Sequence, residues 1–490
     1  MGPLRWLARL AALAVAGAAV AGQPAPDRVL RGTLTRADHQ TWREIPFDVP
    51  RDVDRLTVTF AYGGRDQHTT VDLGVLDPGG FRGWSGGNKA GFTLSARDAT
   101  PSYLPGPIAP GRWLLLLGVA NLRPGVRSDY VAEIRFGHGE AAAAAPLQSG
   151  PAWYRGDLHT HSAHSDATCA SQSGVMVPCP VFRTLEAAAA RGLDFVVVSD
   201  HNTVSQDQEL LALQPLFDRL LLIPGEEVTT FHGHLGVIGA AGWTDFRLGG
   251  PTVPDVAALL DAVGRTGGLA IINHPALPSG EACLGCGWTA AGTPFPRIAG
   301  IEVVNGGVAD GPLSGLAFWE GRLNAGDRLA AVGGSDNHRP DAAPDAFAAV
   351  GRPTTVVWAQ ALSRPEILAA ISAGHVFIDV EGTRDRVLEL TSGGARMGDV
   401  LDTCGPVSGF DAHVAGAPGA LWRVIADGRP ASPVGGPAEG RVGGPDARWS
   451  FTLPTAGVRW VRLEARTADG RRALLIGNPI YLRRPVGCAG

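Results

Sequence analysis

Histidine and carboxylate residues gather in the middle of this chain. Nine of its 13 histidines lie between residues 159 and 375, and most of these follow directly after a short apolar run of the β type. Imidazole nitrogen and carboxylate oxygen are ligands that suit Zn, Mn or Fe. Their positions predict a site for divalent metal ions. The residues placed at the ends of such runs are His159, His161, Asp200, His201, Glu226, Glu227, His274, Asp336 and His338.

The spacing of these residues indicates what the ions would do. His159 and His161 are two positions apart, so on an extended strand both imidazoles face one side and can hold one ion. Asp336 and His338 repeat that spacing. A carboxylate such as Glu227 can bridge two ions, and ions about 3.5–4 Å apart can hydrolyse phosphate and related esters. Because a metal lowers the pKa of bound water toward about 7, we expect hydrolysis by a metal-bound hydroxide.

Single histidines are weaker signals. A lone histidine after a strand is usually a solvated or hydrogen-bonded turn residue, and we expect that role for His164, His232 and His375 taken singly. The reaction also needs a group that moves protons without binding metal. Asp200 and His232 are both candidates, and the sequence does not choose between them.

The elements that must position these residues alternate between strands and helices. Gly192 and Gly326 stand where helix C-caps belong. Alternation over this many units favours parallel strands in a barrel or a doubly wound sheet, whose carboxyl ends gather ligands in one pocket. The predicted strands are 193–198, 220–223, 269–272, 301–304 and 329–332, and the predicted helices are 181–191, 207–219, 255–265 and 313–324.

The flanking segments have a different pattern. Residues 28–136 contain short strand-like runs separated by Gly, Pro and Asp, which predicts an all-β, sandwich-like domain. Residues 137–152 are rich in Ala, Gly and Pro, as in a linker. The α/β pattern occupies residues 153–383. Residues 385–485 return to short strands, which predicts a second small β-sandwich.

Five ordered motifs span about residues 153–380. They are Asp157-Leu-His-Thr-His161-Ser162 with Ser165-Asp166, Gly192-Leu-Asp-Phe with Ser199-Asp-His201-Asn202, Pro224-Gly-Glu-Glu227-Val-Thr-Thr with Gly233-His234, Asn273-His274-Pro275, and Gly334-Ser-Asp336-Asn-His338. These motifs resemble those of the PHP (polymerase and histidinol phosphatase) metallohydrolase family. Within the family the pattern is most similar to the CehA/McbA-type metallohydrolases, which include carbamate-ester hydrolases.

This resemblance implies a distorted (β/α)7 TIM-like barrel that holds two or three divalent metal ions. Glu226 competes with Glu227 as the bridging carboxylate, and the family spacing Gly-x-Glu favours Glu227. Asp200 would orient an imidazole instead of binding metal. The segment 168–180, with two cysteines, looks like an insertion after the first motif. Carried over to this sequence, the ligands are His159, His161, Glu227 and Asp336 for the first ion, Glu227, His234 and His274 for the second, and Asp166, His201 and His338 for the third.

The composition argues against several other classes of protein. The formal net charge is 42 − 47 = −5, so the chain has no excess of basic residues that would indicate nucleic-acid binding. Lys89 is the only lysine, which excludes a Walker phosphate loop and a lysine Schiff base elsewhere in the chain. With 490 residues, of which 45% are hydrophobic, the chain is long enough for several folded domains.

The amino terminus has the features of a secretion signal over residues 1–21. Arg5 and Arg9 precede the apolar run 10–20, and Ala19-Val20-Ala21 offers a cleavage site. The run is short for a membrane span, so we expect a secreted or periplasmic protein with no stable span after cleavage.

Six cysteines fit an oxidising compartment, and although they allow 15 pairings, we favour three local pairs. The pairs are Cys169 with Cys179, Cys283 with Cys286 and Cys404 with Cys488, and the rival interpretation of Cys283-Leu-Gly-Cys286 is a zinc half-site.

The substrate class is open at this stage. Phosphoesters are the favoured substrates, with Arg339 and Arg352 as candidate cationic side chains that would donate hydrogen bonds to phosphate. Carboxyl or carbamate esters are the close alternative. A serine hydrolase is a rival class, because residues 83–87 match G-x-S-x-G around Ser85, although turn residues surround the match. A non-catalytic secreted binding protein with a degenerate barrel is a third possibility. The sequence does not reveal the oligomeric state.

Overall fold

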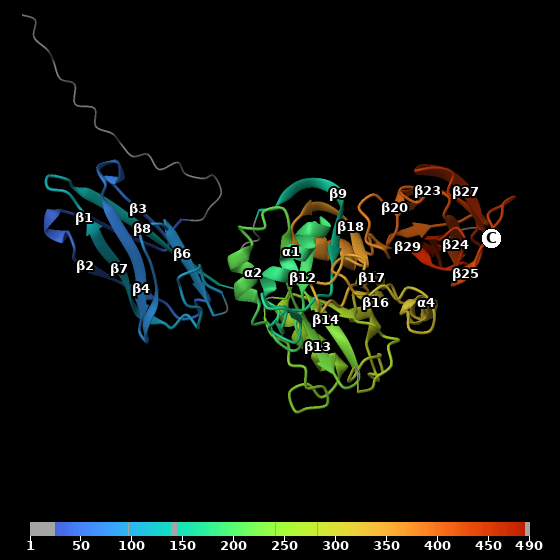
Figure 1. Ribbon diagram of the computed structural model, residues 1–490, viewed down its shortest axis with the longest axis horizontal. Coiled ribbons are helices and arrows are strands. Elements are labelled where there is room, and N and C mark those ends of the chain that lie inside the picture. Colours follow the sequence, from blue (N-terminus) through green and yellow to red (C-terminus); the bar gives the residue numbers. More distant parts are fainter. Residues whose placement is uncertain (1–24, 97, 139–144, 241, 282, 486–490) are drawn as a thin grey trace, which may run out of the picture. The chain divides into compact units, whose positions relative to one another are not determined.

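The computed structural model describes residues 25–96, 98–138, 145–240, 242–281 and 283–485 (Figure 1). The predicted signal sequence, residues 1–21, lies outside these ranges. The chain divides into two compact units, residues 1–139 and 140–490. Within the described ranges, no helix is both long and apolar enough to cross a membrane.

The first unit contains two four-stranded antiparallel sheets, blue to cyan in Figure 1. In β3, Leu56, Val58 and Phe60 are buried and alternate with more exposed residues, which is the period of a half-buried strand. The buried faces of both sheets share one hydrophobic core. The first sheet has the order β1 (Arg28–Leu34), β8 (Ser128–Gly137), β3 (Arg55–Tyr62) and β6 (Gly91–Ser95), and the second β2 (Trp42–Val49), β7 (Gly111–Asn121), β4 (Thr70–Asp77) and β5 (Gly80–Ser85).

The second unit is mixed α/β and is built on one large sheet. Strands β9, β12 and β13 are parallel to one another, and so are β15, β16 and β17. The first nine strands in sheet order are β17 (Ala330–Gly334), β16 (Gly300–Asn305), β15 (Leu269–Ile272), β14 (Gly233–Ile238), β13 (Leu221–Thr230), β12 (Phe195–Val198), β9 (Gln148–Asp157), β18 (Thr354–Leu362) and β19 (Val376–Asp379).

The five predicted strands all run in one direction, as expected, but two strands that the sequence analysis did not predict, β14 and β18, run antiparallel to their neighbours. β14 pairs antiparallel with both β13 and β15, and β18 pairs antiparallel with β9. Only Phe231 and His232 separate β13 from β14, and a connection that short can join only antiparallel neighbours. β13 is also longer than predicted, so Glu227 lies within a strand instead of following one.

In the described part of the second unit, five α-helices connect these strands, and α1 and α2 contact β12 and β13 (Figure 1). Gly192 and Gly326 end α1 and α4 in the left-handed conformation, as predicted. α2 ends six residues before the predicted position because Pro215 cannot continue the helix. The helices are α1 (Val181–Arg191), α2 (Asp207–Leu213), α3 (Val256–Thr266), α4 (Leu316–Ala325) and α5 (Arg364–Ser372), with short 3-10 turns at Arg36–Asp38, Arg65–Gln67 and Phe295–Arg297.

The sheet curls so that β17, at one end of the strand order, lies against β18 and β19. Side chains make the junction, because the Gly333 backbone N–H donates to Thr355 Oγ1 (2.8 Å) and Asn478 Nδ2 donates to the Ala331 carbonyl (2.9 Å). This curvature brings the ends of β9, β13, β15 and β17 around one centre.

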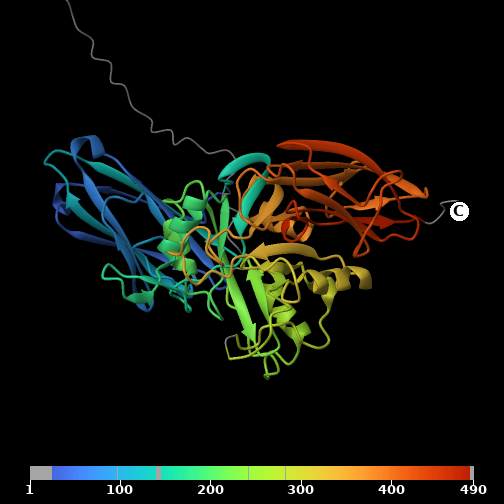
Figure 2. The same ribbon diagram turned by 45° about the vertical axis from the view of Figure 1, so that its right-hand side comes forward.

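The carboxy-terminal strands, orange and red in Figures 1 and 2, belong to two sheets. Because β19 pairs antiparallel with β29 (Ala473–Gly477), some of them continue the large sheet, whereas β20, β21, β23 and β27 form a separate four-stranded sheet that shares a hydrophobic core with β28 and β29. The segment expected to be a linker, 137–152, also overlaps β9, which begins at Gln148. The remaining strands are β10 (Thr168–Ala170), β11 (Met176–Pro178), β20 (Val387–Ser392), β21 (Ala395–Arg396), β22 (Val400–Asp402), β23 (Val407–Ala415), β24 (Leu421–Ala426), β25 (Arg429–Pro430), β26 (Glu439–Arg441), β27 (Asp446–Pro454), β28 (Trp460–Arg466), β29 (Ala473–Gly477) and β30 (Ile480–Arg483).

Candidate metal centre

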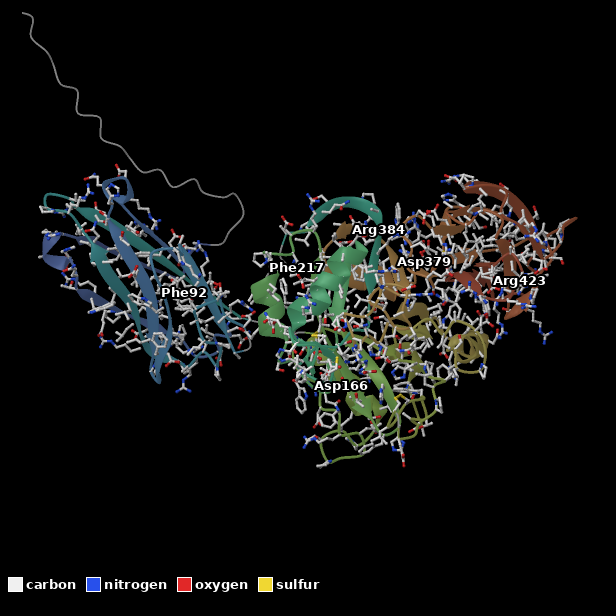
Figure 3. All side chains as sticks on the ribbon, viewed as in Figure 1. Phe92, Asp166, Phe217, Asp379, Arg384 and Arg423 are labelled. Carbon is white, nitrogen blue, oxygen red and sulfur yellow. A yellow bond between two sulfur atoms is a disulfide. The ribbon has the colours of Figure 1, made fainter. Side chains whose placement is uncertain are left out.

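The nine predicted metal ligands come from separate elements and meet in one place. They lie on β13 and β14 and in the loops that directly follow β9, β12, β15 and β17. Asp166, labelled in Figure 3, comes from the loop after β9. The structure sorts the nine residues into three groups whose ligand atoms lie within 4.8 Å of one another: His159, His161, Glu227 and Asp336; Glu227, His234 and His274; and His161, Asp166, His201 and His338.

Three of the four residues in the first group are buried, and the side chain of the fourth, Asp336, is 22% exposed. His159 Nε2 lies 3.2 Å from Glu227 Oε2 and 3.3 Å from Asp336 Oδ1. His161 Nε2 lies 3.1 Å from the same Asp336 oxygen. The side chains of His159, His161 and Glu227 are at most 2% exposed. Four donors converge here from three parts of the chain.

The second group uses the other oxygen of Glu227. Glu227 Oε1 lies 3.3 Å from His234 Nδ1 and 3.1 Å from His274 Nε2. Asn273 Nδ2 donates to the same oxygen at 2.9 Å. Glu227 therefore presents Oε2 to the first group and Oε1 to the second, which is the geometry of a bridging carboxylate.

The third group is the one that solvent reaches. His338 Nε2 lies 3.2 Å from Asp166 Oδ1, and His201 Nε2 lies 3.8 Å from it. The Asp166 side chain is 58% exposed and that of His338 32% exposed. His161 belongs to this group and to the first, so the exposed and buried groups are joined through one imidazole.

Adjacent glutamates on β13 have opposite environments. Successive strand residues point to opposite faces. Glu227 faces the donor cluster, whereas Glu226 accepts a hydrogen bond from the Thr244 backbone N–H at 2.7 Å. Burial raises the pKa of Glu226 to about 8. Glu226 is thus a largely protonated glutamic acid outside the three groups.

Three polar residues outside the set of predicted ligands support these ligands. Glu302, on β16, lies 3.2 Å from His159 Nδ1 and accepts a hydrogen bond from the His274 backbone N–H at 2.9 Å. Asn305 Nδ2 donates to Asp336 Oδ2 at 3.1 Å, and Asn273 supports Glu227. The available signal for Glu302 was its position inside the apolar run 301–304, where a charged residue needs a partner.

The two candidates for proton transfer lie outside the three groups. Asp200 is buried and accepts hydrogen bonds from the Ser162 backbone N–H (2.7 Å) and from Ser162 and Ser165 Oγ (2.6 Å each). It therefore holds the loop that carries His161 and Asp166. His232 is exposed in the turn between β13 and β14, two residues before His234.

The electrostatics of the cluster are those of paired opposite charges. Burial raises the pKa of Glu227 and Asp336, but nearby histidines outweigh burial and hold both values well below the ordinary range. Burial lowers the pKa of His338, and its hydrogen bond with Asp166 reverses the effect, raising the value to about 9. Burial and neighbouring histidines lower the pKa of His161 to about 4. The carboxylates are ionised and ready to bind cations.

Unsatisfied polar atoms show that the donor set fits divalent ions. Four buried atoms in the cluster have no hydrogen-bond partner among the described residues: His159 Nε2, Glu227 Oε2, His234 Nδ1 and His274 Nδ1. Buried polar atoms without partners are rare unless an ion or water binds there. His274 (φ 25°) and Asp336 (φ 54°) also have left-handed backbones, and such strain gathers at functional sites.

Comparisons with known proteins add little to this description. No protein-family model matches the sequence, and no curated protein matches it. A two-domain protein from Bacteroides vulgatus, predicted to contain a PHP-like metal-dependent phosphoesterase, is similar in structure at 16% identity and a TM-score of 0.38, over 70% of this chain and all of the other.

A protein from Bifidobacterium adolescentis, provisionally described as a metal-dependent phosphoesterase, is similar at 17% identity and a TM-score of 0.28, over 37% of this chain and 87% of the other. At these TM-scores the likeness is too partial to support a fold or an activity.

The other sequence candidates have structural partners. Ser85 lies on β5, where its Oγ is 2.9 Å from the Tyr103 hydroxyl, so it is not on a strand-to-helix elbow. His164 bonds Ser205 and His375 bonds Asp399, as expected of turn residues. Arg339 pairs with Asp341.

The disulfides agree with two of the three favoured pairs. Cys169 is bonded to Cys179, and Cys283 to Cys286. The first bridge joins β10 to β11 within the predicted insertion. Cys488, the expected partner of Cys404, lies outside the described residues.

Proposed function

We propose that this chain is a metal-dependent hydrolase of ester bonds, with phosphoesters as the favoured class, and that its sheet forms a distorted TIM-like barrel. The observation that carries the proposal is the position of Glu227, whose two oxygens face two separate donor groups. Two or three divalent ions (Zn, Mn or Fe) would supply Lewis acidity and acidify water in this centre.

The chain's own residues prepare this chemistry. Glu302 accepts the Nδ1 proton of His159, which leaves Nε2 free to face Glu227 and Asp336. Asp200 fixes the first-motif loop, and Asn305 orients Asp336. Substrate would approach the exposed side, at Asp166 and His338. For proton transfer we favour His232, because the hydrogen bonds that Asp200 accepts come from Ser162 and Ser165 and hold the first-motif loop.

Carboxyl or carbamate esters are the second candidate. Phe231 is 84% exposed in the turn that leads to His234, and Leu284 is 65% exposed beside the same histidine. Exposed apolar residues near the centre favour an ester with an apolar group. Arg339 pairs with Asp341, and Arg352 donates to the Asp345 carbonyl. Each guanidinium group therefore already has a partner in the protein, which weakens the case for phosphate.

The deciding experiment measures metal content and turnover together. Purified protein is analysed by elemental mass spectrometry and assayed with p-nitrophenyl phosphate, bis-p-nitrophenyl phosphate, p-nitrophenyl acetate and a naphthyl carbamate. His159→Ala and Asp336→Ala should lose metal and activity. His413→Ala is the matched control, because His413 bonds Glu389 and Asp446 in the carboxy-terminal strands.

Two or more ions per chain, with turnover that a chelator abolishes, would support the proposal, and the preferred substrate would decide the ester class. A folded protein that binds no divalent metal would refute it and favour a binding protein.

We further propose that the protein is exported and acts on a small-molecule substrate, with no nucleic-acid partner. The two disulfides support export, since such bonds persist in oxidising compartments. Detection of the mature chain outside the cytoplasm, with an amino terminus near Gly22, tests the location.

A further inference from the structure

The loop Cys283–Cys286 lies against one imidazole of the metal centre. His234 Nε2 is 3.0 Å from the carbonyl oxygen of Leu284, which lies between the two cysteines. A carbonyl only accepts hydrogen bonds, so Nε2 carries the proton and Nδ1 keeps its lone pair. Nδ1 is the nitrogen that faces Glu227, at 3.3 Å. The loop therefore selects the tautomer of His234 that can bind an ion in the second group.

The backbone of the Cys283–Cys286 loop packs closely against β13, which carries Glu227. Gly285 has φ +81°, and a Cβ at this position would lie 1.9 Å from the Thr230 carbonyl on β13, so only glycine fits. The Gly285 N–H donates to Ser279 Oγ at 2.9 Å. The disulfide between Cys283 and Cys286 closes the same turn. The cysteines thus have a defined position beside His234.

The two sulfurs and a nitrogen of His234 form a donor set of their own. Their atoms lie within 4.8 Å of one another, with His234 and Cys286 buried and Cys283 half-buried. Thiolate and imidazole are the ligands of structural zinc sites, and the C-x-x-C spacing places two thiolates on one ion. In the disulfide form the sulfurs are bonded to each other. Two electrons convert them into two ligands.

We propose that reduction of the Cys283–Cys286 disulfide creates a Cys2His site for a thiophilic divalent cation, and that this site competes with the second group of the metal centre for His234. The reductant is a dithiol: it becomes a disulfide and delivers two electrons and two protons to the cysteines. The cation then displaces both thiol protons, which pass to solvent, and binds His234 Nε2, whose proton moves to Nδ1. A protonated Nδ1 no longer serves the second group.

Cadmium binding tests the new site without any assay of activity. Metal-free full-length protein is reduced with an immobilised dithiol, separated from it without oxygen, and titrated with Cd²⁺. We expect the ultraviolet thiolate-to-cadmium charge-transfer band and roughly one more Cd²⁺ per chain than in the oxidised protein. Reduced protein whose thiols are alkylated should lack the band.

Matched variants separate this loop from the other disulfide. Cys283→Ser with Cys286→Ser should abolish the additional Cd²⁺, whereas Cys169→Ser with Cys179→Ser should retain it. His234→Gln should weaken cadmium binding but keep part of the band. Equal cadmium uptake by the reduced wild type and the Cys283/Cys286 variant would overturn the proposal.

The competition for His234 rests on the proposed function and has its own measurement. Reduction in the presence of Zn²⁺ should lower hydrolysis about tenfold or more, and reoxidation should restore it. The Cys283/Cys286 double variant should not respond to reductant. A cadmium band with unchanged hydrolysis would overturn the competition. Hydrolysis that is absent even in the oxidised protein would refute the proposed function and leave the cadmium result standing.

Discussion

Glu227 occupies the central position among the individual residues. Its carboxylate is buried and ionised, and each oxygen faces a different set of imidazoles. An ionised buried carboxylate is costly unless opposite charge surrounds it, so this residue has a strong requirement for cations. Its neighbour Glu226, on the other face of β13, bonds a backbone N–H instead.

These two glutamates form a matched pair for mutagenesis. Glu227→Gln should lower turnover by roughly a hundredfold or more and reduce the bound metal, because one charge serves two groups. Glu226→Gln should change both little, because burial raises its pKa to about 8 and keeps it largely neutral near pH 7. Metal analysis and kcat/KM measure the contrast. Equal losses in the two variants would argue against a bridging role.

Glu302 should act on metal affinity through His159. Glu302→Gln weakens the acceptor at His159 Nδ1, so we expect metal affinity to fall about 10–100-fold. Glu209→Gln is the control, since Glu209 also faces a histidine, His164, that belongs to none of the three donor groups. Competition with a metal-binding dye measures both. Unchanged affinity in the first variant would make Glu302 a purely structural residue.

His338 should couple metal binding to pH. Its pKa of about 9 in the metal-free protein lies above the ordinary 6.5, so its stabilising charge is fully present below pH 6.5 and is lost as pH rises through about 9. An ion must displace this proton. At pH 7 we expect wild type to release about one proton more than His338→Gln on binding metal. Calorimetry in buffers of different ionisation enthalpy measures the difference.

At the scale of elements, strand ends and caps position the ligands. His159 follows β9, His274 follows β15 and Asp336 follows β17, and all three strands belong to one curved sheet. α3 follows β14 in the sequence and packs against β15, the strand that precedes His274. Its first turn is capped by Asp255, whose side chain accepts a hydrogen bond from the Ala258 N–H at 2.8 Å.

Loss of this cap should affect stability and not chemistry. Asp255→Ala should lower the free energy of unfolding by about 1 kcal/mol, because it leaves a helix N–H without its partner. Asp261→Ala, on the same helix, removes an exposed ion pair with Arg297 and should cost less than about 0.5 kcal/mol. Urea denaturation measures both, and turnover should be unchanged. A larger effect at Asp261 would contradict this assignment.

At the scale of the whole molecule, some of the carboxy-terminal strands extend the sheet that carries the centre. β29 pairs with β19, and the Asn478 side chain bonds the backbone of Ala331 on β17 and of Val376 on β19. Arg462, also from this segment, is buried and pairs with Glu320 on α4. The contacts are those of one folded unit.

Truncation tests this dependence. Residues 140–490 should fold and bind metal, because they form one compact unit. Residues 140–383 should be insoluble or lack metal. Without β29, one edge of β19 would be exposed, and β17 would lose its hydrogen bonds with Asn478. Circular dichroism and metal analysis decide the outcome. A folded, metal-binding 140–383 fragment would show that the carboxy-terminal strands are accessory.

Local patterns in the sequence were enough to place most of the elements. Apolar runs and capping glycines located β15 at 269–272 and α1 at 181–191, because side-chain periodicity and positive φ are properties of neighbouring residues. The nine candidate ligands were chosen from motifs, and the structure brings them together. Whether they bind metal is the prediction that elemental analysis tests.

Other features of the fold and the site depend on long-range contacts. Which distant strands become neighbours decides that β14 is antiparallel and that Glu227, not Glu226, faces the donors. It also decides the roles of Glu302 and Asn478. Local residue types identify donors and strand segments because those depend on a few adjacent side chains. The direction each donor faces, and the carbonyl of Leu284 beside His234, depend on the path of the whole sheet, which only the tertiary fold determines.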